Sequence, residues 1–269
     1  MQGESNIAHK KRKIQFAVYF HVIRIFVAVL CIFFPASLLI DGNTDGKIVD
    51  LDLTVKDYVS GEVPSGWSLK KVPGYTTSKV SVEWVKDKNG TVGVRLFSDG
   101  ALTFLKRKVN IDISRYPIVT WRWKVENILY GNDERMKIGD DHPIRIFFVF
   151  DPDIKRQSIW FRFKRLLYLD MIHGHPVGGR FTEYLWSNSL KPGTILPDPS
   201  KPRQKLIVIE GGKENLNRWL SYERNLYDDF KRLYGEEPRR LIFIGIINDT
   251  DQTNQKAISY IGNLMFHSE

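Results

Sequence analysis

The sequence predicts an all-β-dominated fold, a jelly roll or β-sandwich with one or two short helices, preceded by an N-terminal hydrophobic helix. The main evidence is a series of short apolar or alternating runs separated by turn residues at regular spacing. Length agrees, because all-β sandwiches reach about 200–250 residues as a single domain. We therefore divide the chain into a leader at 1–40, a polar linker at 41–50 and a β-sandwich domain at 51–269.

The leader differs in kind from the rest of the chain. A basic cluster, Lys10–Lys13, precedes a nearly continuous apolar run, Phe16–Phe34. This pattern predicts a signal peptide or an uncleaved signal anchor, and puts the following domain in the periplasm or another extracytoplasmic space. Arg24 costs about 2.5–3.5 kcal/mol in a membrane span and favours a signal peptide. No clean cleavage site follows, so a cleaved leader and an inner-membrane anchor both stay open.

Nine strands are predicted along the domain. They are Val80–Val85, Thr91–Ser98, Ala101–Val109, Ile118–Val125, Ile144–Phe150, Phe181–Trp186, Lys205–Ile209, Leu241–Ile247 and Ala257–Phe266. Asp87–Gly90 predicts a hairpin turn, because Asn-Gly tolerates the positive φ of a tight turn. Two of the strands, Ile144–Phe150 and Leu241–Ile247, are apolar at nearly every position, which predicts burial on both faces.

One helix is predicted after Asn225, which can act as its N-cap, with Gly235 as its C-terminal cap. The segment before it, Arg218–Arg224, fits a strand or a helix. Leu190–Arg203 carries four prolines and predicts a connection, because proline cannot donate to a central ladder. Lys155–Arg180 mixes basic and aromatic residues, so it predicts either a contact with an anionic membrane surface or a solvated face packed on the domain.

Composition excludes several functions. Of the net charge of +9, the leader carries +4, which leaves a mild surplus of +5, and no nucleic-acid motif is present. The one cysteine, Cys31, lies in the leader, so the domain has no disulfide, thiolate nucleophile or Cys-ligated zinc. The sequence also has no G-x-S-x-G, H-E-x-x-H, P-loop or G-x-G-x-x-G motif. His173-Gly174-His175 is a weak metal signal without partners at ligand spacing. We expect no cofactor, and calcium is the one metal that the carboxylates of the domain could hold.

Carboxylates gather where predicted strands begin or end. Asp140 and Asp141 precede one buried strand, and the polar turn with Asn248, Asp249 and Asp251 follows another. Such groups could cap turns, hydrogen-bond a sugar, hold calcium or act as an acid–base pair. The weak catalytic candidates are Asp141, Glu223, Asp249 and Asp251, and the weak metal candidates are Asp249 and Asp251.

Aromatic residues give a second set of candidates. Trp121 and Trp123 alternate on a predicted strand, so both indoles share one face, which either fills the core or stacks on sugar rings. Tyr184 and Trp186 are likewise two residues apart on the predicted strand Phe181–Trp186. The predicted ligand-binding residues are Trp121, Trp123, Asp140, Asp141, Tyr184, Trp186, Asn248, Asp249 and Asp251.

These elements, taken in order, resemble the bacterial domain-of-unknown-function family 3047. The resemblance runs through Trp121–Val125, Gly139-Asp140-Asp141 with Arg145–Phe150, Tyr184-Leu185-Trp186, Trp219 with Glu223–Leu226 and Asp229-Phe230, and Gly245–Thr253. It implies export and a jelly-roll sandwich similar to carbohydrate-binding modules, and it supplies no catalytic residue. Lys155–Arg180 departs from the family in being longer than its usual connection.

Three functions follow as hypotheses. The first is a non-enzymatic envelope module that binds a glycan or cell-wall polymer. The second is a carbohydrate-active hydrolase or lyase that uses the strand-end carboxylates. The third is a structural or assembly protein of the envelope, which contacts a membrane or partner through residues 155–180.

Overall fold

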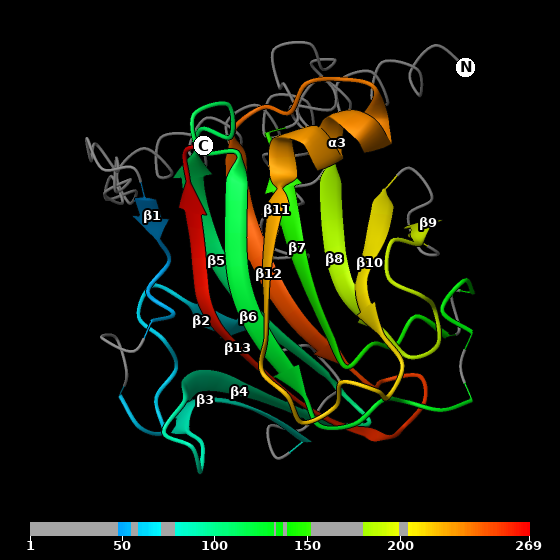
Figure 1. Ribbon diagram of the computed structural model, residues 1–269. Helices are drawn as coiled ribbons and strands as arrows, with labels where there is room; N and C mark the ends of the chain where they lie inside the picture. The colour runs from blue at the N-terminus through cyan, green and yellow to red at the C-terminus, as the bar shows by residue number, and fades with distance from the viewer. Residues whose placement is uncertain are drawn as a thin grey trace, which may run out of the picture. The chain divides into compact units, whose positions relative to one another are not determined.

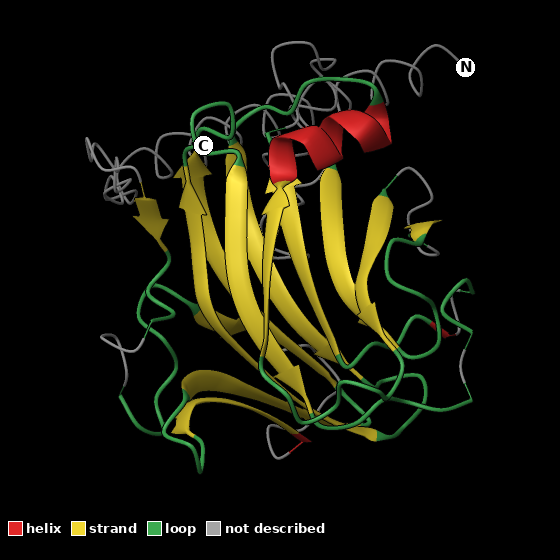
Figure 2. Cartoon of the chain, viewed as in Figure 1, coloured by secondary structure: helices red, strands yellow, loops and turns green. Residues whose placement is uncertain are grey.

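The computed structural model describes residues 48–54, 59–70, 79–131, 133–136, 139–151, 180–198 and 204–269, all within the unit Gly42–Glu269. In these residues the chain forms two β-sheets and one short α-helix (Figure 2). The predicted β-sandwich is confirmed. The leader, most of the linker, His173-Gly174-His175 and Lys155–Gly179 lie outside the described residues. No helix of the described residues is long and apolar enough to cross a membrane.

The two sheets lie face to face and are connected by loops at their ends (Figure 1). The six-stranded sheet has the order β11-β6-β13-β4-β3, with β1 paired to β13. Its strands are β1 (Ile48–Asp50), β3 (Val80–Lys86), β4 (Val92–Asp99), β6 (Ile118–Val125), β11 (Leu220–Asn225) and β13 (Lys256–His267). Strand β1 occupies the end of the predicted linker, because Val49 and the buried Leu51 and Leu53 that follow it pack on the core.

The seven-stranded sheet has the order β2-β5-β12-β7-β8-β10-β9, and only its β8–β10 pair is parallel. Its strands are β2 (Ser68–Lys70), β5 (Leu102–Ile111), β7 (Ile144–Phe150), β8 (Phe181–Ser187), β9 (Ile195–Pro197), β10 (Lys205–Gly211) and β12 (Leu241–Asp249). Strand β9 adds one short edge strand to the proline-rich connection predicted at Leu190–Arg203.

The main hydrophobic core lies between the sheets and follows the alternation of the strands. Strand β7 contributes Ile144, Ile146, Phe148 and Phe150, and strand β6 contributes Val119, Trp121, Trp123 and Val125. Each large side chain buried in this way stabilises the fold by about 1.5–3 kcal/mol. The alternation therefore explains why these strands form and which of their faces turns inward.

A smaller apolar cluster covers the other face of the seven-stranded sheet, which we call its outer face. Its members are Phe104, Phe147, Val149, Phe181 and Phe243, which alternate with core residues on the same strands. Strands β7 and β12 are thus buried on both faces, as their continuous apolar sequences predict. At Gly245 in β12 a Cβ would overlap the Phe147 ring and lie 2.6 Å from Cε2 of Phe104, so glycine leaves room for both rings.

The predicted turn and helix are confirmed. In the β3–β4 hairpin Gly90 has φ +82° and its N–H donates to the Asp87 carbonyl at 2.9 Å. Helix α3 (Leu226–Tyr234) begins at Asn225, whose Oδ1 accepts from the Asp228 N–H, and ends at the left-handed Gly235. The segment Arg218–Arg224, for which the sequence left strand and helix open, forms strand β11 from Leu220 onward, and Trp219 directly precedes that strand.

Candidate functional site

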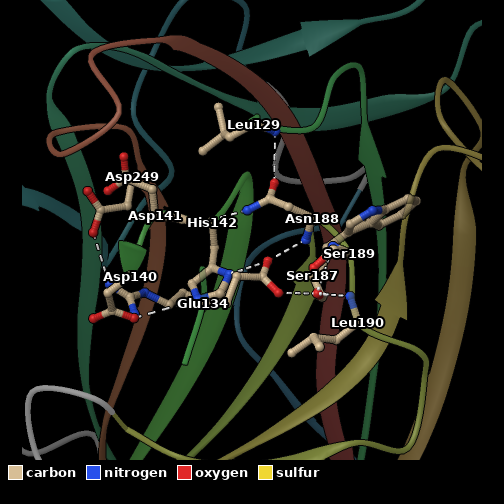
Figure 3. A network of polar contacts seen from close by, with 12 residues as sticks. Leu129, Glu134, Asp140, Asp141, His142, Ser187, Asn188, Ser189, Leu190 and Asp249 are labelled. Atoms are coloured by element: carbon tan, nitrogen blue, oxygen red, sulfur yellow. Dashed lines mark hydrogen bonds and ion pairs between the residues drawn. The ribbon is translucent and has the colours of Figure 1, made fainter. Parts of the chain in front are cut away.

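The candidate site lies at one end of the seven-stranded sheet. Strand β7 runs antiparallel to β8 and β12, so its first residues meet the last residues of those two strands. The loop before β7 carries Glu134 and Asp140–His142, and the turn after β12 carries Asp251. Figure 3 shows polar side chains of the loop before β7 lying close to Asp249 of β12 and to Ser187 and Asn188 at the end of β8.

Arg145 is the buried cation of this site. It shares the outer face of β7 with Phe147 and is 7% exposed. Its Nη2 lies 2.9 Å from Oδ2 of Asp249, and its Nη1 lies 3.2 Å from Asp140 and 3.7 Å from Glu183. Burial alone would lower the pKa of Arg145, but these three carboxylates raise it above its ordinary value. The guanidinium therefore stays charged and connects the loop before β7, strand β8 and the end of β12.

His142 provides a second positive charge. Its Nδ1 lies 3.4 Å from Glu134 and its Nε2 lies 3.6 Å from Asp140, and the ring is 1% exposed. Burial opposes the charged form, but Asp140 and Glu134 outweigh it and raise the pKa of His142 to about 9. The imidazole is therefore protonated at neutral pH.

Glu134 joins the loop before β7 to the end of β8. Its carboxylate accepts hydrogen bonds from the Ser187 hydroxyl and the Asn188 N–H (Figure 3). Asn188 in turn donates to the Asp141 carbonyl at 2.9 Å and accepts from the Leu129 N–H at 2.8 Å. Burial would raise the pKa of Glu134, but His142 and these hydrogen bonds lower it overall. The network thus fixes the loop between β6 and β7 against the end of β8 and the loop that follows it.

Three carboxylates meet at the end of β12. Asp141, Asp249 and Asp251 each offer an oxygen within 4.8 Å of the others, so together they could hold a metal ion. Burial, Asp251 and Asp141 raise the pKa of Asp249 to about 7, although Arg145 opposes the shift. Asp141 also accepts from the Thr253 N–H at 2.6 Å, which is the turn-capping role of an aspartate. Calcium binding, which the sequence allows, stays untested.

The turn after β12 also contacts the loop before β7. Gln255 accepts from the Tyr130 N–H at 3.1 Å and donates to the Tyr130 carbonyl at 2.7 Å. Gln252 accepts from the Asp140 N–H at 3.3 Å. The turn therefore holds both ends of the loop before β7, and the Tyr130 side chain is 68% exposed. We call Tyr130, Asp251 and Gln252 the rim.

Comparison with known proteins assigns a family. The family model described as protein of unknown function DUF3047 matches residues 65–265. The chain belongs to this family. No curated protein matches it in sequence.

Solved structures with a related arrangement share little sequence with this DUF3047 domain. A family 30 carbohydrate-binding module of a cellulosomal cellulase of Clostridium thermocellum has 11% identity and a TM-score of 0.38, and the match covers 82% of this chain and 98% of that one. The xyloglucanase domain of NopAA, a type three effector from Sinorhizobium fredii, has 8% identity and a TM-score of 0.38, over 78% and 97% of the two chains. These values are too low for the likeness to carry an argument about function.

The structure corrects the ligand-binding role predicted for four aromatic residues of this DUF3047 domain. Trp121, Trp123, Tyr184 and Trp186 are each at most 1% exposed. Trp121 stacks on Tyr184 with centroids 5.3 Å apart, and Trp123 lies 5.5 Å from Trp121. The shared face predicted for the two indoles exists, but it is the inner face of the sheet and offers no surface to a sugar.

The ligand-binding role predicted for Asn248 is also corrected, because this side chain is buried. Its side chain points into the sandwich, where it accepts from Ser98 and donates to Ser259 at 3.0 Å. Both partners belong to the opposite sheet, so Asn248 connects the two sheets. Glu223 is exposed on the edge strand β11 of the six-stranded sheet and does not join the other three candidate carboxylates.

Sequence reasoning missed the roles of Glu134, His142 and Tyr130. Glu134 and His142 gave no signal, because their pairing depends on a loop that folds back on itself. Tyr130 gave a weak signal: it is an aromatic residue followed by Gly131 in a polar stretch without strand alternation.

Proposed function

We propose that this DUF3047 domain is a non-enzymatic module that binds a glycan, with the rim as its binding surface. The observation that carries the proposal is the exposed Tyr130 side chain. Gln255 holds the Tyr130 backbone, and the turn that carries Gln255 also carries the polar residues Asp251 and Gln252. A sugar ring has an apolar C–H face and polar edges. It can pack on an aromatic ring while carboxylate and amide groups accept and donate hydrogen bonds to its hydroxyls.

The buried network beneath the rim supports binding rather than hydrolysis. A glycoside hydrolase of the usual kind needs two carboxyl groups that reach the same substrate. Asp141 is fully buried and Asp249 is 3% exposed, so of the three converging carboxylates only Asp251 reaches the surface. The raised pKa of Asp249 follows from burial and neighbouring charge. The network instead preorganises the loops that carry the rim, which lowers the entropy cost of binding.

The test is glycan binding by the full-length chain. We expect some member of a panel of bacterial and plant oligosaccharides to bind, and Tyr130→Ala to weaken that binding about tenfold through the lost aromatic contact. Ile195→Ala, which truncates an exposed apolar side chain on β9, is the control and should bind as the parent does. Unchanged affinity of the Tyr130 variant in calorimetric titration contradicts the assignment of the rim.

Location in the cell envelope is part of the same proposal. It is supported by the basic cluster and apolar run of the leader. We expect the protein in the periplasmic or membrane fraction of cells, and recovery in the cytoplasmic fraction would overturn this part. A membrane or assembly role for residues 155–180 stays a prediction, since that segment lies outside the described residues apart from Arg180.

A further inference from the structure

The outer face of the six-stranded sheet carries a second set of polar and aromatic side chains. Along β6, β13 and β4, alternate residues fill the core and the residues between them point outward. One row of outward side chains runs across the strands and consists of Lys124, Tyr260, Arg95 and Glu83. In the neighbouring row, two residues further along β4, Phe97 lies opposite Ile258. Most of these side chains are half-buried, so this face is covered by its own side chains and not by another layer of the described chain.

Trp219 is fixed across this face. Its Nε1 donates to Oδ2 of Asp87 at 2.9 Å. A Cβ on Gly93 would lie 2.5 Å from Cη2 of the indole, so the ring rests where β4 has no side chain. The Arg122 guanidinium lies 5.0 Å from the ring centroid and the Lys124 ammonium lies 5.5 Å from it. The indole is thus held in one place while part of it stays accessible.

The charges around Trp219 are balanced. Arg95 pairs with Glu83 at 3.3 Å and Lys124 lies 3.9 Å from Asp87. The Tyr260 hydroxyl donates to Glu126 at 2.5 Å. Three cations, with Arg122 as the third, therefore face three carboxylates, and no excess of one sign favours an ionic ligand. The same groups offer donors and acceptors suited to hydroxyls.

Phe97 provides a second aromatic ring on the same face. It lies four residues beyond Gly93 on β4, which is a separation of about 13 Å along the strand. Arg95 lies between the two positions, with its guanidinium 5.4 Å from the Phe97 centroid. Two rings at this spacing, with hydrogen-bonding groups between them, match a linear ligand whose apolar and polar parts repeat.

We propose that the face formed by Trp219, Arg122, Lys124, Tyr260, Arg95 and Phe97, the Trp219 face, is a second glycan-binding surface that takes an extended, uncharged polysaccharide chain. The inference rests on the proposed glycan-binding function but not on the rim. Two surfaces on one domain raise the apparent affinity for a long polymer well above that of either alone, provided that the chain can reach both.

The experiment compares polymer binding by full-length variants. The probes are an uncharged β-glucan polymer, short oligosaccharides cut from it, and a polygalacturonate as the charged counterpart. Phe97→Ala and Trp219→Phe should each weaken binding of the uncharged polymer about tenfold. Tyr227→Ala, a partly buried aromatic residue on α3, is the control and should leave it unchanged. Trp219→Phe keeps an aromatic filler over Gly93, so the test does not depend on a variant that loses its fold.

The outcomes separate this inference from the function on which it rests. Absence of binding to every glycan by the parent chain overturns both. Binding that is lost in Tyr130→Ala but intact in Phe97→Ala and Trp219→Phe overturns the Trp219 face alone. Tighter binding of the polygalacturonate than of the uncharged polymer overturns the proposed ligand class. Weakened polymer binding in both face variants, with thermal midpoints like that of the parent, supports it.

Discussion

At the scale of single residues, Arg145 shows how a charge is kept inside this sandwich. A buried ion pair adds little to stability on its own, because desolvation offsets the attraction. Removing one partner is nevertheless costly, since the others are left charged and buried. Arg145 has Asp140, Glu183 and Asp249 as partners, so its role is to hold the loop before β7, strand β8 and the end of β12 together. The sequence showed an arginine in an apolar strand but not which carboxylates it would meet.

Gly245 allows a direct test of packing on the outer face of the seven-stranded sheet. Gly245→Ala places a Cβ against the rings of Phe147 and Phe104, and overpacking of this kind costs about 1–3 kcal/mol. We expect urea unfolding to show that loss. The cost should shrink in a Phe147→Ala background, because the main obstacle is then gone. Replacing glycine by alanine stabilises a protein where the Cβ meets no obstacle. A more stable Gly245→Ala variant would therefore show that the two rings leave room for a Cβ at this position.

At the scale of elements, the sequence predicts strands well because alternation and turn residues are local signals. β6 and β7 have the predicted bounds, and Asn225 and Gly235 cap α3 as expected. Which face of a strand turns inward is not a local property. Trp121 and Trp123 share a face as predicted, but only the second sheet decides that this face is the core.

The candidate site was predicted in part for the same reason. Asp140, Asp141, Asp249 and Asp251 lie at strand ends that antiparallel pairing brings together, so their convergence could be predicted. The position of Trp219 could not, because it depends on Gly93 and Asp87, more than 120 residues earlier in the chain. Local patterns therefore identify strand-end chemistry better than chemistry on the face of a sheet.

At the scale of the whole molecule, the buried network makes stability depend on pH. The pKa of Asp249 is raised to about 7 and that of His142 to about 9, so the folded protein holds both protons more tightly than the unfolded chain does. The stability from Asp249 is complete below about pH 4 and is lost as the pH rises through 7. The stability from His142 is complete below about 6.5 and is lost as the pH rises through 9.

Glu134 and Asp140 act in the opposite direction. Their pKa values are lowered in the folded state, despite burial, by His142 and Arg145 among other contacts. The stability that they contribute is present above the pKa of a free carboxyl and is lost in strong acid. The contribution of Glu134 and Asp140 is complete near pH 4.5, and above that pH the loss from Asp249 dominates, so the two opposing effects place the maximum near pH 4.5. The pH range of greatest stability is thus set by four side chains at one end of the sandwich.

We expect the free energy of unfolding to fall by a few kcal/mol from pH 5 to pH 9, since one pKa unit corresponds to about 1.4 kcal/mol. Urea unfolding of the full-length chain at several pH values measures it. Asp249→Asn should flatten the decline between pH 5 and 7, and His142→Gln should flatten it between pH 7 and 9. The two ranges therefore separate the two groups within one set of curves. A stability that is level or rises across this range contradicts the assignment, because the two protons would then not be held more tightly by the folded chain.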